Sequence, residues 1–391
     1  MNIPKIRFSE FNDEWKKIQL NSFVEINPKN DSLPEQFIYI DLESVNNGLL
    51  TNRKIISKSE APSRAQRTVK ENDILYQTVR PYQMNNLFIN NLDSEYPYIA
   101  STGYALLRTN ENPYFVYSIL YQKSFVNKVL DMCTGTSYPA ISANDLGTIT
   151  VSLPNIKEQE KISKTLSLLD KKIELQSRKI EDLKLFKKGL DKIIFSNQSL
   201  FDEDTIKNRF YSDGGTALEE YISNSGTHRI ISIGNYSTTG TYIDNGQKII
   251  LNDKTKTKLL NKDNLVMILN DKTTTGDIIG SSILIEEDNK YIYNQRSQRL
   301  ICKNINPKYA WCYLNNNNFR KHVFKLAQGG TQIYVNFSTI ENQIILIPKN
   351  EQIENMIINS IIGIKDKTDK ETVKLNKLIE LKKGLMQCMF V

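Results

Sequence analysis

A long internal repeat is the feature that most restricts how this chain can fold. Two stretches, which start at Gly135 and Gly330, both run from Gly-Thr through an alternating apolar segment to a proline and then to Glu-Gln. A charged segment follows each stretch, and the two segments end in similar motifs, FKKGLDKIIF in the first half and LKKGLMQCMF in the second. One offset of 195 residues relates Gly135 to Gly330 and Gly189 to Gly384. This period is much too long for a solenoid and indicates two similar halves.

The two charged segments carry a heptad pattern. In each, apolar side chains alternate spacings of four and three residues, and the offset of 195 carries one series onto the other without a slip. Such spacing flanked by charge is typical of coiled-coil helices. Polar residues interrupt both seams at equivalent positions, Gln176 with Glu371 and Lys187 with Lys382. The apolar residues expected to pack along the seams are Ile162, Leu166, Leu169, Ile173, Ile180, Leu183 and Leu190, and then Ile357, Ile361, Ile364, Leu375, Leu378 and Leu385.

Each long helix is expected to begin just after a proline, Pro154 or Pro348, because proline is not tolerated inside a helix. A helix over 157–195 would be roughly 58 Å long at about 1.5 Å per residue, which is too long to lie across one small globule. The pattern therefore favours rods that bridge globular parts. A long helix packed on its own domain is the alternative.

The remaining residues predict two similar lobes. Short apolar runs separated by Gly-containing turns indicate β-strands in both. Amphipathic patterns that start at Asn112-Pro113 and at Asn306-Pro307 predict a helix at equivalent places. We therefore expect an α+β chain of two globular domains separated by two long helices. The expected ranges are 1–152 for the first domain, 153–196 for the first helix, 197–347 for the second domain and 348–391 for the second helix.

Composition excludes several classes of protein. No apolar run is long enough to span a bilayer, and no secretory signal is visible at the N-terminus, so we expect a cytoplasmic protein. The four cysteines form no CxxC pair and there are only two histidines, which argues against a zinc site or a disulfide framework. The formal net charge of +7 permits a polyanionic partner without requiring one.

The sequence contains no recognisable catalytic motif. Patterns for phosphate loops, dinucleotide binding, metalloproteases and serine hydrolases are absent. The word Asn112-Pro113-Tyr114-Phe115 is close to the one expected of an adenine methyltransferase, but it lacks a second proline, and helix initiation explains it better. We therefore expect no catalytic residues and no metal site in this chain.

Both lobes contain loops that mix Arg, Lys, Gln, Thr and Tyr. Such side chains can bond base edges and phosphates. A solvated surface is the alternative for any single loop, but similar loops at equivalent places in both lobes favour DNA binding. The candidate DNA-binding residues are Arg64, Gln66, Arg67, Gln77, Arg80, Tyr82, Thr136, Ser137 and Tyr138 in the first lobe, and Lys272, Thr273, Thr274, Gln295, Arg296, Ser297, Gln298, Gln328, Thr331 and Gln332 in the second.

Taken together, these motifs show that the chain resembles the specificity (S) subunit of type I restriction–modification enzymes. The resemblance is carried by PKIRFSEFNDEWKKIQL near the N-terminus, by the ordered Gly-Thr, Pro and Glu-Gln words of each half, and by the two Lys-Lys-Gly-Leu words. It implies that each lobe is a target recognition domain that reads one half of a bipartite site in double-stranded DNA. It also implies that the helices pair antiparallel, as a pseudo-twofold repeat, and fix the gap between the half-sites.

The resemblance further implies partners. Two methyltransferase (M) subunits, which bind S-adenosylmethionine and methylate adenine, would dock on the helices, and restriction (R) subunits, which use ATP and Mg²⁺, would join them. This chain would be non-catalytic, hold no cofactor, and act against phage DNA in the bacterial cytoplasm, away from any membrane. The alternatives are a coiled-coil interaction scaffold and a stand-alone nucleic-acid-modifying enzyme. Trp15 and Leu20 have no clear counterpart in FDEDTIKNRFYSDGG, so the start of the second recognition domain stays open.

Overall fold

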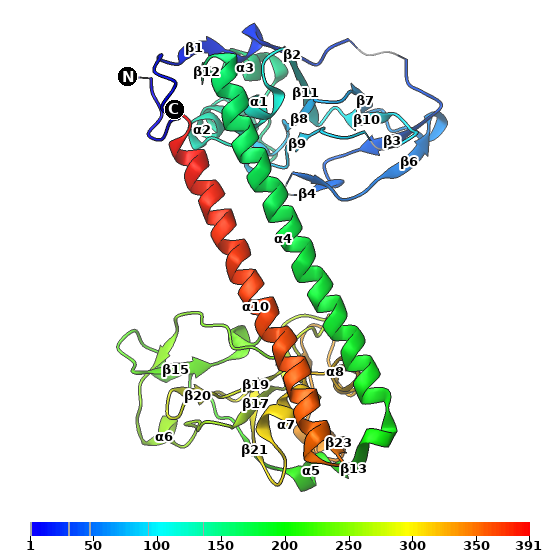
Figure 1. Ribbon diagram of the computed structural model, residues 1–391, viewed down its shortest axis with the longest axis vertical. Coiled ribbons are helices and arrows are strands. Elements are labelled where there is room, and N and C mark those ends of the chain that lie inside the picture. Colours follow the sequence, from blue (N-terminus) through cyan, green and yellow to red (C-terminus); the bar gives the residue numbers. More distant parts are fainter. Residues whose placement is uncertain (1, 30–31, 47, 93, 136) are drawn as a thin grey trace. The chain divides into compact units, whose positions relative to one another are not determined.

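The chain divides into two compact units. The computed structural model describes residues 2–29, 32–46, 48–92, 94–135 and 137–391. Unit 1 comprises Met1–Gln176 with Lys374–Val391, and unit 2 comprises Ser177–Val373. Each unit contains a mixed globular part and a stretch of both long helices, α4 (Ile156–Ser196) and α10 (Glu351–Cys388), which are continuous in Figure 1.

Unit 1 is built on two four-stranded sheets, with the strand orders β2–β11–β8–β9 and β6–β3–β10–β7. Their pairs are antiparallel except that β10 runs parallel to β3. A further ladder joins β1 to β12, the strand that precedes α4. The strands are β1 (Lys16–Gln19), β2 (Val24–Ile26), β3 (Gln36–Ile40), β4 (Val45–Asn46), β5 (Leu49–Leu50), β6 (Lys54–Ser57), β7 (Ala65–Val69), β8 (Ile74–Gln77), β9 (Leu87–Phe88), β10 (Tyr98–Ser101), β11 (Tyr104–Thr109) and β12 (Thr150–Leu153).

Three short helices complete unit 1: α1 (Pro113–Ile119), α2 (Lys123–Asp131) and α3 (Ala143–Thr148). The sequence pattern predicts one helix where the structure has α1 and α2. In a straight helix Phe125 would point about 80° away from Phe115, because each residue turns the helix by about 100°. The break between α1 and α2 lets both rings enter the same core.

Unit 2 repeats most of this topology, but its second sheet has three strands and no counterpart of β7. Its main sheets have the orders β14–β21–β17–β19 and β16–β15–β20, with β20 parallel to β15, and β13 pairs with β23 as β1 does with β12. The strands are β13 (Phe201–Thr205), β14 (Phe210–Gly214), β15 (His228–Ile231), β16 (Lys248–Ile249), β17 (Leu265–Ile268), β18 (Asn270–Asp271), β19 (Ser282–Leu284), β20 (Tyr291–Tyr293), β21 (Ser297–Cys302), β22 (Ile333–Tyr334) and β23 (Ile344–Pro348). The helices are α5 (Ile206–Arg209), α6 (Asp253–Lys256), α7 (Pro307–Leu314), α8 (Asn317–Lys325) and α9 (Phe337–Ile340).

The matching ladders reveal where the second lobe begins. Strand β1 lies between Trp15 and Leu20, which are both buried. Strand β13 begins at Phe201 and is followed by Ile206, which are also buried. An aromatic residue and an aliphatic residue five positions later therefore open both lobes. The sequence comparison missed this because the strand between them reads Lys-Lys-Ile-Gln in one lobe and Asp-Glu-Asp-Thr in the other.

Both long helices begin at an asparagine cap. Asn155 Oδ1 accepts a hydrogen bond from the Glu158 N–H over 3.0 Å, and Asn350 Oδ1 accepts one from the Ile353 N–H over 2.9 Å. The caps are 195 residues apart, whereas the two Glu-Gln words are 193 apart. The first Glu-Gln word is buried and the second is exposed. The expected equivalence of these Glu-Gln motifs is therefore wrong. Helix α10 starts three residues after Pro348, whereas α4 starts two residues after Pro154.

In unit 1, α4 and α10 share one hydrophobic core. Ile162 and Leu166 from the start of α4 pack in the same cluster as Met389 and Phe390, which follow α10. Further along α4, the Asp170 carboxylate pairs with Lys382 over 2.5 Å. Residues further along α4 thus contact residues closer to the N-terminal end of α10.

Unit 2 shows the same order of contacts. Ile194 and Phe195 at the end of α4 pack in one cluster with Ile357 and Ile361 near the start of α10. Closer to the middle of both helices, Lys179 pairs with the buried Glu371 over 3.0 Å. All the apolar residues expected at the seams lie buried or half-buried. Many other apolar residues of the helices are exposed, among them Leu168, Leu175, Leu185, Phe186, Ile193, Val373, Ile379 and Leu381.

Candidate nucleic-acid interface

In unit 1 the structure brings two of the candidate loops together, 77–83 and 134–140. The Arg80 N–H donates a hydrogen bond to the Pro139 carbonyl over 2.8 Å. The Arg80 guanidinium lies 4.3 Å from the centroid of the Tyr138 ring, within the range of a cation–π contact. Because Tyr138 is 64% exposed, the pair presents an aromatic face and a cation at the surface.

The third candidate segment of this unit, 64–67, lies at the same edge. The Thr102 N–H donates to the Arg64 carbonyl over 2.8 Å, and the adjacent Gly103 carbonyl accepts from the Thr78 N–H over 3.0 Å. Thr78 belongs to the 77–83 loop. Hydrogen-bonded backbone therefore connects all three candidate segments of unit 1.

The side chains of these segments differ in whether they reach solvent. Gln77 is buried, and its Nε2 donates to the Val79 carbonyl over 2.8 Å and to Gln83 Oε1 over 2.9 Å. Gln77 thus supports the loop from inside, which corrects the surface role expected of it. Burial also lowers the pKa of Arg67. The exposed candidates are Arg64, Gln66, Tyr82, Ser137 and Tyr138, the half-buried ones are Arg67 and Arg80, and Thr136 lies outside the described residues.

The backbone of the 77–83 loop is held in an uncommon conformation. Arg80 and Met84 have φ angles of 55° and 52°, and they flank the 3₁₀ turn Pro81–Gln83. Left-handed φ costs a residue with a side chain roughly 1–2 kcal/mol, so the surrounding contacts must fix this loop. The buried Gln77 bonds and the Pro139 carbonyl supply such contacts.

Unit 2 also brings its candidate segments together, although 295–298 is the turn between β20 and β21 and corresponds to the β10–β11 turn of unit 1 rather than to 64–67. The Leu269 N–H donates to the Arg296 carbonyl over 2.9 Å, and the next residues form β18, which pairs with β22. Gln328 and Tyr334 exchange two N–H to carbonyl hydrogen bonds of 2.8 Å, which close the turn before β22. The segments that meet at this edge are 272–274, 295–298 and 328–332.

Two candidates of unit 2 have internal partners. Ser297 is buried, and its hydroxyl accepts a hydrogen bond from the Tyr236 hydroxyl over 2.8 Å, so the expectation that it faces DNA is corrected. The Thr273 N–H and hydroxyl both donate to Asp271 Oδ1 over 2.9 Å, which fixes the turn. The exposed candidates are Lys272, Thr273, Thr274, Gln295, Gln328, Thr331 and Gln332, and the half-buried ones are Arg296 and Gln298.

Sequence reasoning missed an acidic residue beside the 295–298 segment. Gln295 Nε2 donates to Glu219 Oε1 over 2.8 Å, although the two residues are 76 positions apart. Burial opposes ionisation of Glu219, but hydrogen bonds from Gln295 and from backbone N–H groups outweigh it and lower the pKa of this carboxyl. Glu219 therefore stays ionised and orients the Gln295 amide. No local sequence signal pointed to it.

A second unforeseen group is a charged network under the same sheet. The Asp213 carboxylate pairs with Lys258 and with Arg299, each over 3.0 Å, and it accepts a hydrogen bond from the buried Tyr293 hydroxyl over 2.7 Å. These contacts fasten β14, β20 and β21 together beneath the 295–298 turn. We infer a supporting role for the network, since Asp213 binds a side chain from each of the neighbouring strands β20 and β21.

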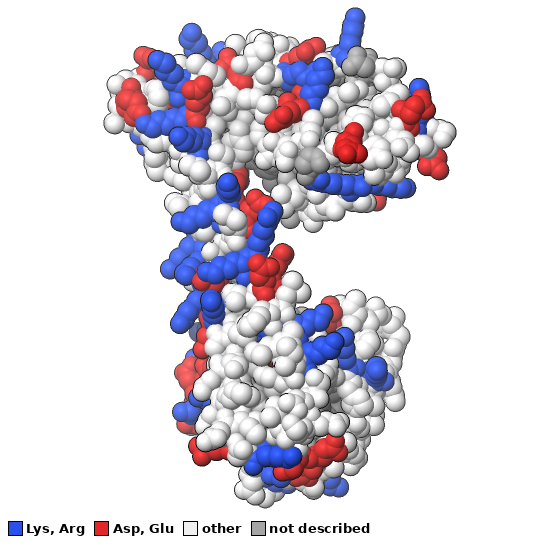
Figure 2. Space-filling model, turned by 45° about the vertical axis from the view of Figure 1, so that its right-hand side comes forward, with Lys and Arg blue, Asp and Glu red and all other residues white. Residues whose placement is uncertain are grey.

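The long helices carry many charges. Figure 2 shows Lys and Arg side chains along their exposed surface. In the part of the chain that the structure describes, no group of three or more His, Cys, Asp or Glu side chains could hold a metal ion. No helix in the described ranges is long and apolar enough to cross a membrane.

Comparison with known proteins identifies relatives. The family model described as the type I restriction modification DNA specificity domain matches residues 12–185. The HindI type I restriction enzyme specificity subunit of Haemophilus influenzae is 27% identical over 184 residues, which are 45% of this chain and 39% of that protein. The MjaVIII specificity subunit of Methanocaldococcus jannaschii is 24% identical over 412 residues, which cover 94% of this chain and 91% of that protein.

Solved structures share the fold. The type I restriction–modification S subunit from M. genitalium superposes with a TM-score of 0.65 at 18% identity and covers 100% of this chain and 99% of its own. A chain from a structure on the assembly and conformational transition of a type I restriction–modification system gives a TM-score of 0.57 at 17% identity, covering 95% of this chain and 96% of its own. At such low identity these likenesses establish the fold alone.

Proposed function

Because the chain belongs to the family of type I restriction–modification specificity subunits, we propose that it reads a bipartite site in double-stranded DNA, one half-site per unit. One observation carries the proposal. In both units the segment after the central strand, β8 or β17, meets the segment 134–140 or 328–334. Exposed polar candidates surround this junction, namely Arg64, Gln66, Tyr82, Ser137 and Tyr138 in unit 1 and Lys272, Thr273, Thr274, Gln295, Gln328, Thr331 and Gln332 in unit 2. In this family the specificity subunit recognises DNA and does not catalyse a reaction.

The loop chemistry suits base reading. Arg80 is held by its backbone and by the Tyr138 ring, so its guanidinium loses little freedom on binding. Arginine bonds guanine in bidentate fashion, and Gln amides such as those of Gln328 and Gln332 do so with adenine. Lys272 and the neighbouring threonines suit phosphates. Direct readout and backbone positioning are thus both available at each edge.

We propose that 1–152 and 197–347 are the target recognition domains and that the helices of 153–196 and 348–391 form an antiparallel coiled coil between them. The shared cores support this, since within each unit residues further along α4 contact residues closer to the N-terminal end of α10. The ion pairs Asp170–Lys382 and Lys179–Glu371 follow the same order. Antiparallel pairing of equivalent helices would relate the domains by a pseudo-twofold axis and set the gap between half-sites.

The proposed complex includes catalytic partners. Two methyltransferase subunits with S-adenosylmethionine would methylate adenine, and restriction subunits would supply ATP- and Mg²⁺-dependent cleavage in the bacterial cytoplasm. Exposed apolar residues on the long helices, such as Leu185, Phe186 and Ile193, support docking there. The relatedness of the fold to a chain from a type I assembly structure is consistent with it.

Binding of the assembled specificity–methyltransferase complex to a cognate duplex, measured across salt, tests DNA reading. Arg80→Ala should weaken binding by about tenfold, equivalent to about 1.4 kcal/mol, because one base or phosphate contact is lost. Lys54→Ala removes one exposed charge from strand β6 and serves as the matched control. Equal affinities for the two variants, or an affinity of the wild-type complex that salt does not change, would contradict the proposal.

The spacer role has its own test. Deleting one heptad from each helix at paired positions keeps the seam in phase and shortens both rods by about 10 Å. We expect the complex to recognise the same half-sites with a smaller gap. An unchanged gap would show that the helices do not set the spacing.

A further inference from the structure

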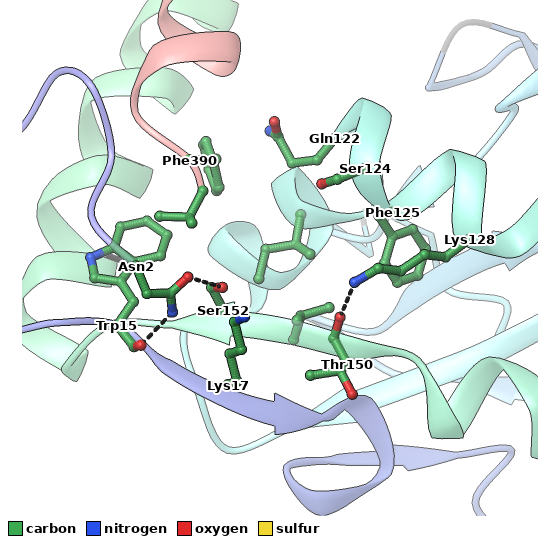
Figure 3. A pocket seen from close by; sticks show the side chains of 13 residues that line it. Asn2, Trp15, Lys17, Gln122, Ser124, Phe125, Lys128, Thr150, Ser152 and Phe390 are labelled. Atoms are coloured by element: carbon green, nitrogen blue, oxygen red, sulfur yellow. Dashed lines mark hydrogen bonds between the residues drawn. The ribbon is translucent and has the colours of Figure 1, made fainter.

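Unit 1 contains a cavity beside the ladder of β1 and β12. Its volume is about 230 Å³. Figure 3 shows Trp15, Phe125 and Phe390 around it, with Lys17 and Lys128 at its rim. The cavity is open to solvent and combines aromatic walls with a cationic edge.

The equivalent place in unit 2 is filled by a tyrosine. The Tyr313 ring lies 5.6 Å from the Phe195 ring and 5.4 Å from the Phe319 ring, centroid to centroid. Its hydroxyl donates a hydrogen bond to the Ile344 carbonyl on β23 over 3.1 Å. Tyr313 is buried, so its ring occupies this position in unit 2.

The repeat assigns each of these positions a partner in unit 1. Helices α1 and α7 both start at an Asn-Pro pair, 194 residues apart, and this offset places Ile119 where unit 2 has Tyr313. The other equivalents are Phe125 for Phe319, Phe390 for Phe195, and the Thr150 carbonyl for the Ile344 carbonyl. All four residues of unit 1 line the cavity. The position of the cavity therefore corresponds to that of the Tyr313 ring in unit 2.

The Thr150 carbonyl keeps a polar partner in place of a phenol. Lys128 Nζ donates to it over 2.7 Å, as Figure 3 shows. A phenol hydroxyl in the cavity would compete for this oxygen and release Lys128 toward solvent. The acceptor that Tyr313 uses in unit 2 is thus present and accessible in unit 1.

The charge of the rim also differs between the units. Lys17 and Lys128 are both exposed, and none of the described residues that line the cavity has an acidic side chain. The equivalent positions in unit 2 hold Glu203 and His322. Electrostatic complementarity therefore favours an acidic ligand at unit 1 and disfavours the same ligand at unit 2.

We propose that this cavity is a docking socket for a tyrosine side chain in an acidic segment of a partner protein. The ring packs between Phe125 and Phe390, the hydroxyl donates to the Thr150 carbonyl, and flanking carboxylates pair with Lys17 and Lys128. Because Tyr313 fills the equivalent place in unit 2, each chain binds one such segment. A symmetric pair of partners would thereby be bound unequally.

Two probes test the socket on the full chain: p-cresol, which mimics the side chain, and the peptide acetyl-Glu-Glu-Tyr-Glu-Glu-amide. We expect both to bind once per chain in calorimetry and NMR titration. Ile119→Tyr should abolish binding of both probes, because it supplies the ring that unit 2 already has. Ile55→Tyr adds a tyrosine at an exposed strand position and should leave both unchanged. Lys128→Glu should weaken the peptide by about tenfold or more and p-cresol by less than twofold.

Trp15 fluorescence checks that Ile119→Tyr still unfolds cooperatively. If it does not, Ser124→Phe, which covers the mouth from an exposed position, replaces it with the same expectation. The proposal is overturned if p-cresol and the peptide do not bind the wild-type chain, or if they still bind the filled variant. It is also overturned if deoxyadenosine monophosphate displaces p-cresol and binds more tightly, because the socket would then accept a nucleic-acid base.

Discussion

Removing one apolar side chain from the α4 seam should destabilise unit 1 strongly. Leu166 is fully buried and packs in the cluster that contains Trp15, Phe115 and Phe390. Truncation of a buried leucine to alanine costs about 3–5 kcal/mol, from lost transfer free energy and from the cavity left behind. Leu166→Ala should therefore lower the free energy of unfolding of unit 1 by about 3 kcal/mol or more.

The same helix offers a matched control. Leu168 lies two residues further along and is 59% exposed. Leu168→Ala makes the same chemical change and should alter stability by about 0.5 kcal/mol or less. Any general effect of alanine on the helix is common to both variants.

The two tryptophans of the chain allow each unit to be followed separately. Trp15 lies in unit 1 and Trp311 in unit 2. In a Trp311→Phe background, denaturant unfolding followed by fluorescence reports on Trp15 alone. If Leu166→Ala and Leu168→Ala differ by less than about 1 kcal/mol there, the helix seam does not form part of the unit 1 core, and the reasoning fails.

Three further changes probe other contacts. Arg108→Ala should destabilise unit 1 by about 3 kcal/mol, because it removes the cation that pairs with the buried Asp73 carboxylate over 2.6 Å. Lys58→Ala removes one member of an exposed 3.7 Å pair and should cost about 0.5 kcal/mol or less. Denaturation followed by Trp15 fluorescence measures both. Burial raises the pKa of Asp191 despite Lys187, so its contribution to stability is greatest in acid and is lost as the pH rises through that pKa. Asp191→Asn should therefore raise the denaturant midpoint for unfolding of unit 2 at pH 7, and this increase in stability should become smaller in acid. An increase of the same size at pH 7 and in acid would contradict this reasoning. Glu371→Leu should leave the stability of unit 2 within about 1 kcal/mol of wild type or raise it, since the cation that it leaves behind, Lys179, is half exposed and stays solvated, and a large loss in Trp311-monitored unfolding would refute that.

Heptad spacing in the sequence selected residues that the structure buries or half-buries, because a helix seam is a local, periodic property. The same periodicity failed between Asn112 and Asp131, where one predicted helix is two. Nothing local reveals that Phe115 and Phe125 must both reach one core. The caps Asn155 and Asn350 lie 195 residues apart, like the rest of the repeat, whereas the Glu-Gln motifs lie 193 apart and are similar only in sequence.

The candidate interface was predictable as a set of loops and less so as individual side chains. Composition cannot separate a glutamine that bonds its own backbone, such as Gln77, from one that faces solvent, such as Gln66. The meeting of segments 77–83 and 134–140 depends on pairing between distant strands, which no local pattern encodes. For the same reason the partner of Gln295, Glu219, became apparent only in three dimensions.

A map of methylated adenines in cells that carry this chain and the proposed methyltransferase partner tests the central proposal most directly. It should show two short fixed sequences separated by a constant number of unspecified base pairs. Exchanging the 77–83 and 134–140 loops for those of another family member should alter one of the two sequences and leave the other and the gap unchanged. A single contiguous motif, or an exchange that alters both halves, would contradict the proposal that each unit reads its own half-site.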